Sequence, residues 1–167
     1  MTTVDEAAAQ AVADMYDSTD AALLPAAGQR FAGYVNGRYA NVPAIRARFP
    51  KARTFGIDVL GDAWTSARVG DWEPGNFGGQ DPDRLREFIA KREEFKPHTA
   101  TLYCDRYDLP GAEEILAGLW HVVWLSTLDG TDLTGQRTAA GSLIVATQVR
   151  GGVHADYDTS TTLESWR

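Results

Sequence analysis

The feature that most constrains the fold is a repeated alternation of short, apolar, β-prone segments with segments that carry helix signals. The β-prone segments are apolar along most of their length and do not alternate strictly with polar residues. Such strands, separated by helices, are typical of a parallel sheet that helices cover. The predicted strands are residues 30–36, 53–59, 67–72, 98–105, 120–126, 142–147 and 154–158.

Three helices are predicted between these strands. Asn41 and Pro43 are typical of a helix start, and Asp81 followed by Pro82 begins the clearest helix of the chain. The third helix opens at Leu109. Helices are therefore few for the number of strands, and a full eight-fold barrel usually needs at least about 200 residues. For a chain of 167 residues we predict the α/β class, with a compact, incomplete or irregular (β/α) TIM-like barrel, and an open doubly wound sheet as the alternative.

The N-terminal part of the chain is predicted to stand outside this barrel. Residues 4–16 are rich in alanine and place apolar residues such as Val12 and Met15 near helical spacing. We therefore divide the chain into a helical extension at 1–29 and a barrel domain at 30–167. An exposed apolar helix face must be buried somewhere. The extension is therefore predicted to mediate self-association or contact with a protein partner.

Charge and composition exclude several classes of partner. Sixteen Lys and Arg against 23 Asp and Glu leave a net charge of −7, the wrong sign for binding a phosphate backbone, so no nucleic-acid partner is expected. No apolar run approaches the roughly 18 residues that would span a bilayer, so no membrane partner is expected either. The start lacks the features of a secretory signal. The chain is predicted to be made in the cytoplasm. Release from the cell, or incorporation into a virion, would then not use the usual secretory route.

No cofactor and no metal are predicted. Neither a G-x-G-x-x-G nor a P-loop pattern follows any predicted strand. Cys104 is the single cysteine, which excludes an internal disulfide and a cysteine metal cluster. A metal site at His154, Asp156 and Asp158 is the alternative to a surface turn there, and the turn is the favoured interpretation.

The segment Asp71-Trp72-Glu73-Pro74-Gly75 carries the strongest chemical signal. It follows a predicted strand, and Pro74-Gly75 forces a turn after it. Side chains alternate along a strand, so Asp71 and Glu73 should point to the same side, with Cα atoms about 6.6 Å apart. Two carboxyl groups in one site tend to share a proton, which suits the general acid and the ionised partner of a glycosidase. The alternative is a solvated acidic turn.

Other polar and aromatic residues follow the remaining predicted strands. In a barrel, the carboxyl ends of the strands meet at one rim, where barrel enzymes keep their chemistry. We therefore predict a substrate-binding set around the Asp71 and Glu73 pair. Its members are Tyr34, Asn36, Asp58, Tyr103, Trp124, Gln148, Asp156 and Asp158.

This pattern resembles the family 25 glycoside hydrolases, the lysozyme-like muramidases, and the actinobacterial and phage proteins called glycoside-hydrolase-like. The resemblance rests on Asp71-x-Glu73-Pro74, the strand of Trp124, and the segment from Gln148 to Asp158. It implies that Glu73 is the catalytic acid and Asp71 an electrostatic helper.

The chain departs from the family at one position. The lytic enzymes carry an aspartate just after their first strand, whereas the predicted first strand here ends in Tyr34-Val35-Asn36. Asn36 can bind a sugar but supplies no charge. The resemblance implies hydrolysis of glycosidic bonds in bacterial cell-wall polysaccharide, the peptidoglycan. The alternative is a non-catalytic, carbohydrate-binding or structural component, for example of a phage virion.

Overall fold

The computed structural model describes residues 11–127, 129–150 and 156–166. Eight strands follow one another around a closed barrel in chain order. Strands β1 to β7 pair in parallel, and β8 runs antiparallel to both β7 and β1 and so closes the ring. The strands are β1 (Val12–Asp17), β2 (Arg30–Tyr34), β3 (Arg53–Asp58), β4 (Val69–Asp71), β5 (Thr101–Asp105), β6 (Val122–Ser126), β7 (Ile144–Arg150) and β8 (Asp158–Leu163).

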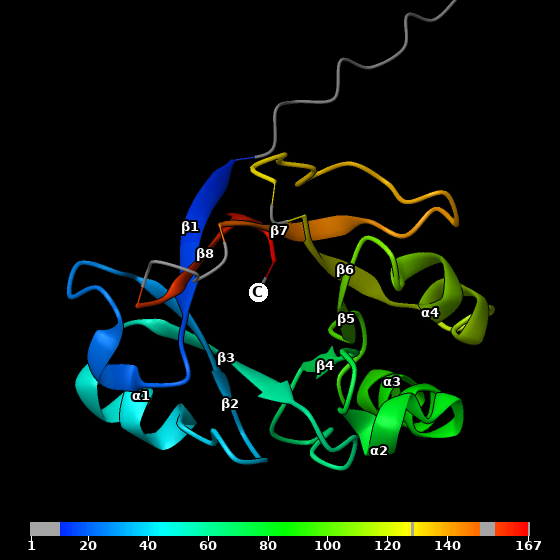
Figure 1. Ribbon diagram of the computed structural model, residues 1–167, viewed down its shortest axis with the longest axis horizontal. Helices are drawn as coiled ribbons and strands as arrows, with labels where there is room; N and C mark the ends of the chain where they lie inside the picture. Colours follow the sequence, from blue (N-terminus) through cyan, green and yellow to red (C-terminus); the bar gives the residue numbers. More distant parts are fainter. Residues whose placement is uncertain (1–10, 128, 151–155, 167) are drawn as a thin grey trace, which may run out of the picture.

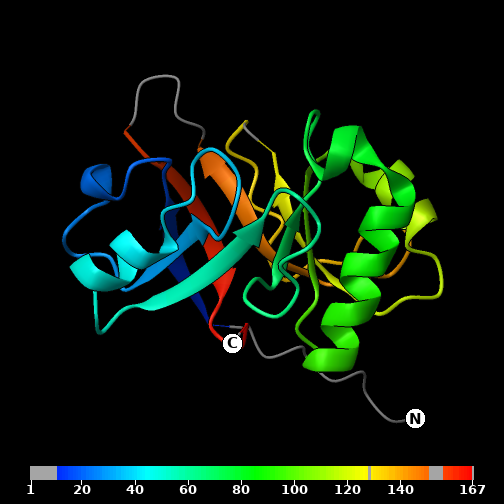
Figure 2. The same ribbon diagram turned by 90° about the horizontal axis from the view of Figure 1, so that it is seen from below.

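Four helices cover part of this barrel. They are α1 (Val42–Arg48), α2 (Phe77–Gln80), α3 (Pro82–Phe95) and α4 (Leu109–Ile115), with a 3-10 turn at Ala21–Leu23. Helix α1 lies against β2 and β3, and α3 lies against β4. The sector formed by β7, β8 and β1 carries none of these helices (Figure 1), and Figure 2 shows α3 running along one side of the barrel.

The predicted TIM-like α/β class is wrong: the fold is a mixed, mostly-strand barrel. A (β/α) barrel places a helix after every strand and keeps all eight strands parallel. Here β8 is antiparallel, and β3 leads to β4 without a helix. The segment before β7 is rich in glycine and threonine, and in its described part an isolated bridge joins Arg137 and Leu143 where a helix would stand. The strand positions were better predicted, because the first six predicted strands overlap β2 to β7.

The predicted N-terminal helix is also wrong over the residues that the structure describes. Val12–Asp17 is strand β1, which pairs with β2 on one side and with β8 on the other. Ladder pairing on both edges outweighs the helix propensity of the alanines nearby. Met15 points into the barrel and is fully buried, so it is not on a free apolar face. The barrel therefore includes residues assigned to the extension, and the start of the predicted helix lies outside the described residues.

Two apolar layers hold the wall of the barrel. The outer layer packs the strands against α3 and α4 through residues such as Phe88 and Leu116. The inner layer fills the barrel and includes Trp124 and Trp166, whose ring centroids lie 6.2 Å apart. Burying each large apolar side chain stabilises the fold by about 1.5–3 kcal/mol. The interior of the barrel is thus a packed apolar core between its two ends.

Candidate active site

The acidic pair lies at the carboxyl end of β4. Asp71 is the last residue of that strand and is 3% exposed. It shares its face with Val69 of the inner layer, so it points into the mouth of the barrel. Glu73 follows two residues later and is half-buried. The turn predicted at Pro74-Gly75 is present, since Gly75 has a φ of +94°.

Strand β1 brings a third carboxyl group to the same mouth. Asp17 ends β1 and is directly opposite Asp158 in the antiparallel ladder. Asp17 is 6% exposed, whereas Asp158 is partly exposed. Asp17 was not among the predicted site residues, because the residues before it were predicted to form a helix and not a strand. A signal was present: Met15 and Asp17 alternate as a strand face would, and polar residues follow Asp17 as they follow the other strands.

Crowding and burial make these carboxyl groups hold protons. Burial, followed by the charges of Asp158 and Glu73, raises the pKa of Asp17 to about 8. Burial and the charge of Glu73 raise the pKa of Asp71 well above its usual range, against a hydrogen bond from Asn76. One carboxylate oxygen of Asp17 and one of Asp71 are buried without a hydrogen-bond partner. Asp17 therefore keeps its proton at neutral pH, and the upward shift in the pKa of Asp71 favours its protonated form. Protonation relieves the repulsion that several buried anions would cause.

Glu73 differs from the two buried aspartates because it is accessible. Burial also raises its pKa, a hydrogen bond with the Tyr103 hydroxyl lowers it, and the charges of Asp105 and Asp158 raise it further. The net result is an upward shift in the pKa of a carboxyl group that solvent can reach. Among the four acidic residues of the mouth, Glu73 therefore best fits a group that donates a proton to a bound molecule.

Aromatic side chains line the mouth below the carboxyl groups. The Tyr103 hydroxyl donates to Oε1 of Gln148 at 2.6 Å, and its ring lies 4.8 Å from that of Trp124. Trp124 is buried and donates from Nε1 to the Ser160 hydroxyl at 3.0 Å. Tyr34 packs against the same inner layer, and burial followed by the charge of Asp17 raises its pKa. Tyr34, Tyr103, Trp124 and Gln148 are thus brought together with the acidic pair.

Two predicted binding residues serve the loops instead. Asp58 is fully buried, and its carboxylate accepts hydrogen bonds from three backbone N–H groups at 2.6–2.8 Å. Asn36 donates to Asp58 at 2.8 Å and to Asp62 at 3.0 Å, and it accepts from the Val59 N–H at 3.1 Å. These bonds shape the loop after β3 and occupy the polar atoms that a substrate would need.

Asp156 lies at the rim with its side chain exposed. Its backbone carbonyl accepts a hydrogen bond from the Ser18 hydroxyl at 2.9 Å, which holds the start of β8 beside the end of β1. The inward position belongs to Asp158, which pairs with Asp17. The prediction that Asp156 would share a cleft with Asp71 and Glu73 therefore applies better to Asp158.

The surface beside the mouth is shallow. A hollow of about 270 Å³ lies between the ends of β5 and β6, lined by Asp105, Tyr107, Ser126 and Asp129 among others. Typical small-molecule pockets have volumes of about 300–1,000 Å³. Hollows of about 580 and 370 Å³ lie at the opposite end of the barrel, and another of about 420 Å³ lies beside α3. Chemistry and volume therefore point to different ends, and we place the candidate active site by chemistry, because only the mouth gathers carboxyl groups with raised pKa values.

A metal centre is not apparent in the described part of the chain, where no group of three or more His, Cys, Asp and Glu side chains could hold an ion. The alternative site at His154 lies outside the described residues. Within those residues, no helix is long and apolar enough to cross a membrane.

Comparisons with known proteins inform the fold alone. No protein-family model matches the chain, and no curated protein matches it. The chain is similar in structure to an uncharacterized B. stearothermophilus protein solved by crystallography, with a TM-score of 0.56 and 12% sequence identity. The similarity covers 91% of this chain and 96% of that one, so it extends over the barrel as a whole.

Proposed function

We propose that this chain hydrolyses glycosidic bonds of bacterial cell-wall glycan, with Glu73 as the general acid. The observation that carries the proposal is the gathering of four acidic residues in one aromatic-lined mouth. They are Asp17, Asp71, Glu73 and Asp158. Paired carboxyl groups of unequal pKa are what glycosidases use to protonate a leaving oxygen and to stabilise an oxocarbenium-like transition state.

The roles follow from accessibility and charge. Glu73 is accessible and has a raised pKa, so it is better suited than an ordinary glutamate to give a proton to the glycosidic oxygen. Asp71, which is more buried than Glu73, acts as the electrostatic helper in its ionised form, because only a carboxylate stabilises a positively charged transition state. Asp17 adds support to the proposal, because it places an aspartate at the end of β1, the first strand of the barrel, whereas Asn36 follows β2.

Digestion of purified peptidoglycan, with measurement of new reducing ends, tests the proposal. We expect Glu73→Gln to lower the rate by about 10²–10⁴-fold, since an amide cannot donate the proton. Asp71→Asn should cost less. Glu94→Gln, on the exposed face of α3, is the matched control and should leave the rate unchanged. Undiminished release by the Glu73 variant would remove Glu73 from the mechanism.

The alternative is a non-catalytic carbohydrate-binding or structural component. The observation that favours it is the shallow surface beside a mouth in which Asp17 and Asp71 are both buried. A wild-type chain that sediments with insoluble peptidoglycan but releases no reducing ends would establish this function instead. Glu73→Gln would then leave sedimentation largely intact, because no proton transfer is involved.

A further inference from the structure

The amino end of the barrel carries a second, independent polar site. A hollow of about 370 Å³ lies there between the start of β3, the residue before β4 and the end of α3. Its lining includes five cationic side chains and neither Asp nor Glu. These side chains are Arg46, Arg53, Arg68, Arg92 and Lys96. A cluster of one sign is unexpected in a chain whose net charge is −7.

Arg68 is the residue that most needs a partner. It is 9% exposed, and its Nε is buried without a hydrogen-bond partner. Its guanidinium lies 5.2 Å from the ring centre of Phe55 and 4.9 Å from that of Trp166. Aromatic faces attract the cation, but they supply no hydrogen-bond acceptor for the N–H groups of the guanidinium. A buried guanidinium without an anion is costly.

Other polar groups line the hollow together with Arg68. Arg92 is buried and held in place, donating from Nε to the Thr99 hydroxyl at 2.9 Å and from a terminal nitrogen to the Trp64 carbonyl at 3.0 Å. The Thr54 hydroxyl is buried without a partner. None of the cations that line the hollow forms a salt bridge with another described residue.

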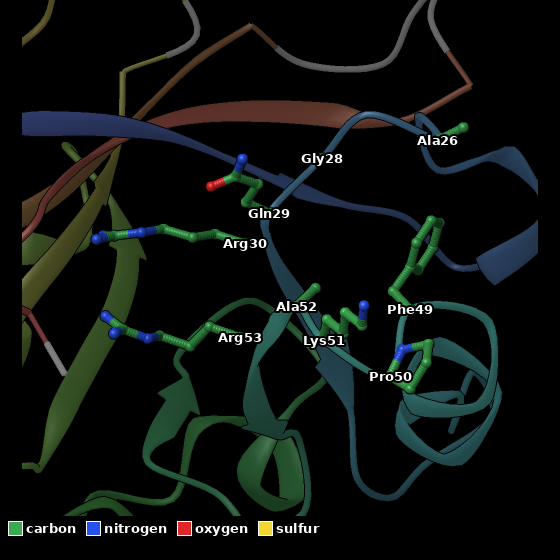
Figure 3. Close-up of a pocket in the computed structure, with 9 residues that line it drawn as sticks. All are labelled: Ala26, Gly28, Gln29, Arg30, Phe49, Pro50, Lys51, Ala52 and Arg53. Carbon is green, nitrogen blue, oxygen red and sulfur yellow. The ribbon is translucent and has the colours of Figure 1, made fainter.

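Arg53 connects this hollow to a neighbouring one of about 580 Å³. Figure 3 shows Arg30 and Arg53 extending side by side from adjacent strands, where the two residues are paired in register. Arg30 is already engaged, since it donates to the Thr162 hydroxyl and to the Leu163 carbonyl, both at 3.0 Å. Arg53 is exposed and free to turn toward an incoming anion.

We propose that this amino-end hollow binds a phosphate-type oxyanion, held by Arg68 and Arg53. Guanidinium forks bind tetrahedral oxyanions through paired, charge-assisted hydrogen bonds. Several cations in a lining that contains neither Asp nor Glu suit a multiply charged anion better than a single carboxylate. The volume is at the lower end of the range for small-molecule sites, so it admits a phosphate group together with a small organic body. This site is separate from glycan hydrolysis and does not depend on it.

Isothermal titration with sodium phosphate, at an ionic strength kept constant with sodium chloride, tests the site. We expect saturable binding by the full chain. Arg68→Gln should weaken the affinity by at least about tenfold, because it removes charge-assisted hydrogen bonds. Arg68→Lys should weaken it less, since the charge stays while the fork is lost. The matched control is Arg38→Gln, an exposed arginine in the loop after β2, which should stay within about twofold of wild type.

Arg53→Gln keeps the test valid if the buried Arg68 variants fold poorly, because Arg53 is exposed. It should weaken phosphate binding severalfold while circular dichroism remains that of the wild type. A parallel titration with glycerol 3-phosphate separates two sources of the same group. Tighter binding of this ester indicates a phosphate carried on an organic molecule, and equal binding indicates the inorganic ion. Absence of saturable binding by the wild type, or equal loss in the Arg53 and Arg38 variants, overturns the proposal.

Discussion

At the carboxyl end of the barrel four acidic side chains gather around the mouth, whereas at the amino end arginines gather around a hollow. The acidic end relieves its repulsion by holding protons, because a carboxyl pKa can rise into the neutral range, as that of Asp17 does. The basic end has no such route. Burial and neighbouring arginines lower the pKa of Arg68 only to about 10, so it stays charged at neutral pH. The acidic end is therefore stabilised by protonation of its carboxyl groups, whereas the positive charge at the basic end is balanced only by a bound anion.

Trp124→Ala should have the largest effect and should disturb both ends of the barrel, because this side chain fills the barrel between them. It is 1% exposed and contacts both Tyr103 on the mouth side and Trp166 on the other. We expect a loss of about 3–5 kcal/mol in the free energy of unfolding, the usual cost of truncating a buried aromatic residue. Urea denaturation measures it. Trp120→Ala, at a tryptophan 43% exposed, should lose far less, and equal losses would show that Trp124 does not hold the core.

Asp17→Asn should show how much protonation of the acidic end contributes to the pH dependence of the free energy of unfolding. The Asp17 pKa is about 8 in the folded chain against an ordinary value of 3.8, so between these values the folded state binds more protons than the unfolded state. The free energy of unfolding therefore falls as pH rises from about 4 to about 8, by up to about 1.4 kcal/mol per pH unit from this group. Asparagine does not titrate, so the variant should lose this contribution and be relatively more stable at pH 8.

Urea denaturation at pH 5, 6, 7 and 8 measures that difference. Asp14→Asn is the control, because Asp14 lies on the same strand with an exposed side chain. Its pH profile should run parallel to that of the wild type. A profile for the Asp17 variant that is also parallel to the wild type would contradict a proton-holding role for Asp17.

Asn36→Ala should have the smallest effect and should separate the mouth from its supporting loops. The substitution removes hydrogen bonds to Asp58, Asp62 and the Val59 backbone, at a cost of about 1–2 kcal/mol in the free energy of unfolding. Glycan cleavage or binding at a temperature well below unfolding should be unchanged. A loss of function without loss of stability would return Asn36 to the substrate-binding set.

The strands were predictable where their pattern was local. Runs such as Val122–Ser126 are apolar, end in polar residues and are bounded by turn signals, so their positions were found. The class of the fold was not predictable in this way, because it depends on whether a helix or a loop connects each pair of strands and on the direction of β8. Strand β1 could not be recognised alone, since its exposed Val12 and alanine-rich surroundings match a helix as well.

The acidic pair was predictable for the same reason, and its surroundings were not. Asp71 ends β4 and Glu73 follows two residues later, so their short separation in the sequence keeps them close together. Asp17 reaches them only through pairing with β8. Asp58 illustrates the opposite error, because a polar residue at a strand end can point away from the mouth and bind its own loop. The alternation of side chains along a strand distinguishes an inward-pointing residue such as Asp71 from a loop-binding residue such as Asp58 only when the strand boundaries are known.

The closure of β1 against β8 has a consequence for how the chain matures during synthesis. Strand β1 leaves the ribosome early and can pair with β2, but its other edge stays open until β8 has been made. Contacts between segments so distant in sequence form late and slow the folding of a domain, and an open edge can meanwhile pair with the wrong chain. Asp17 and Asp158 therefore meet only in the final closing step. A chain that has not yet formed β8 lacks the complete acidic mouth. Any activity of the mouth would therefore first appear when β8 pairs with β1.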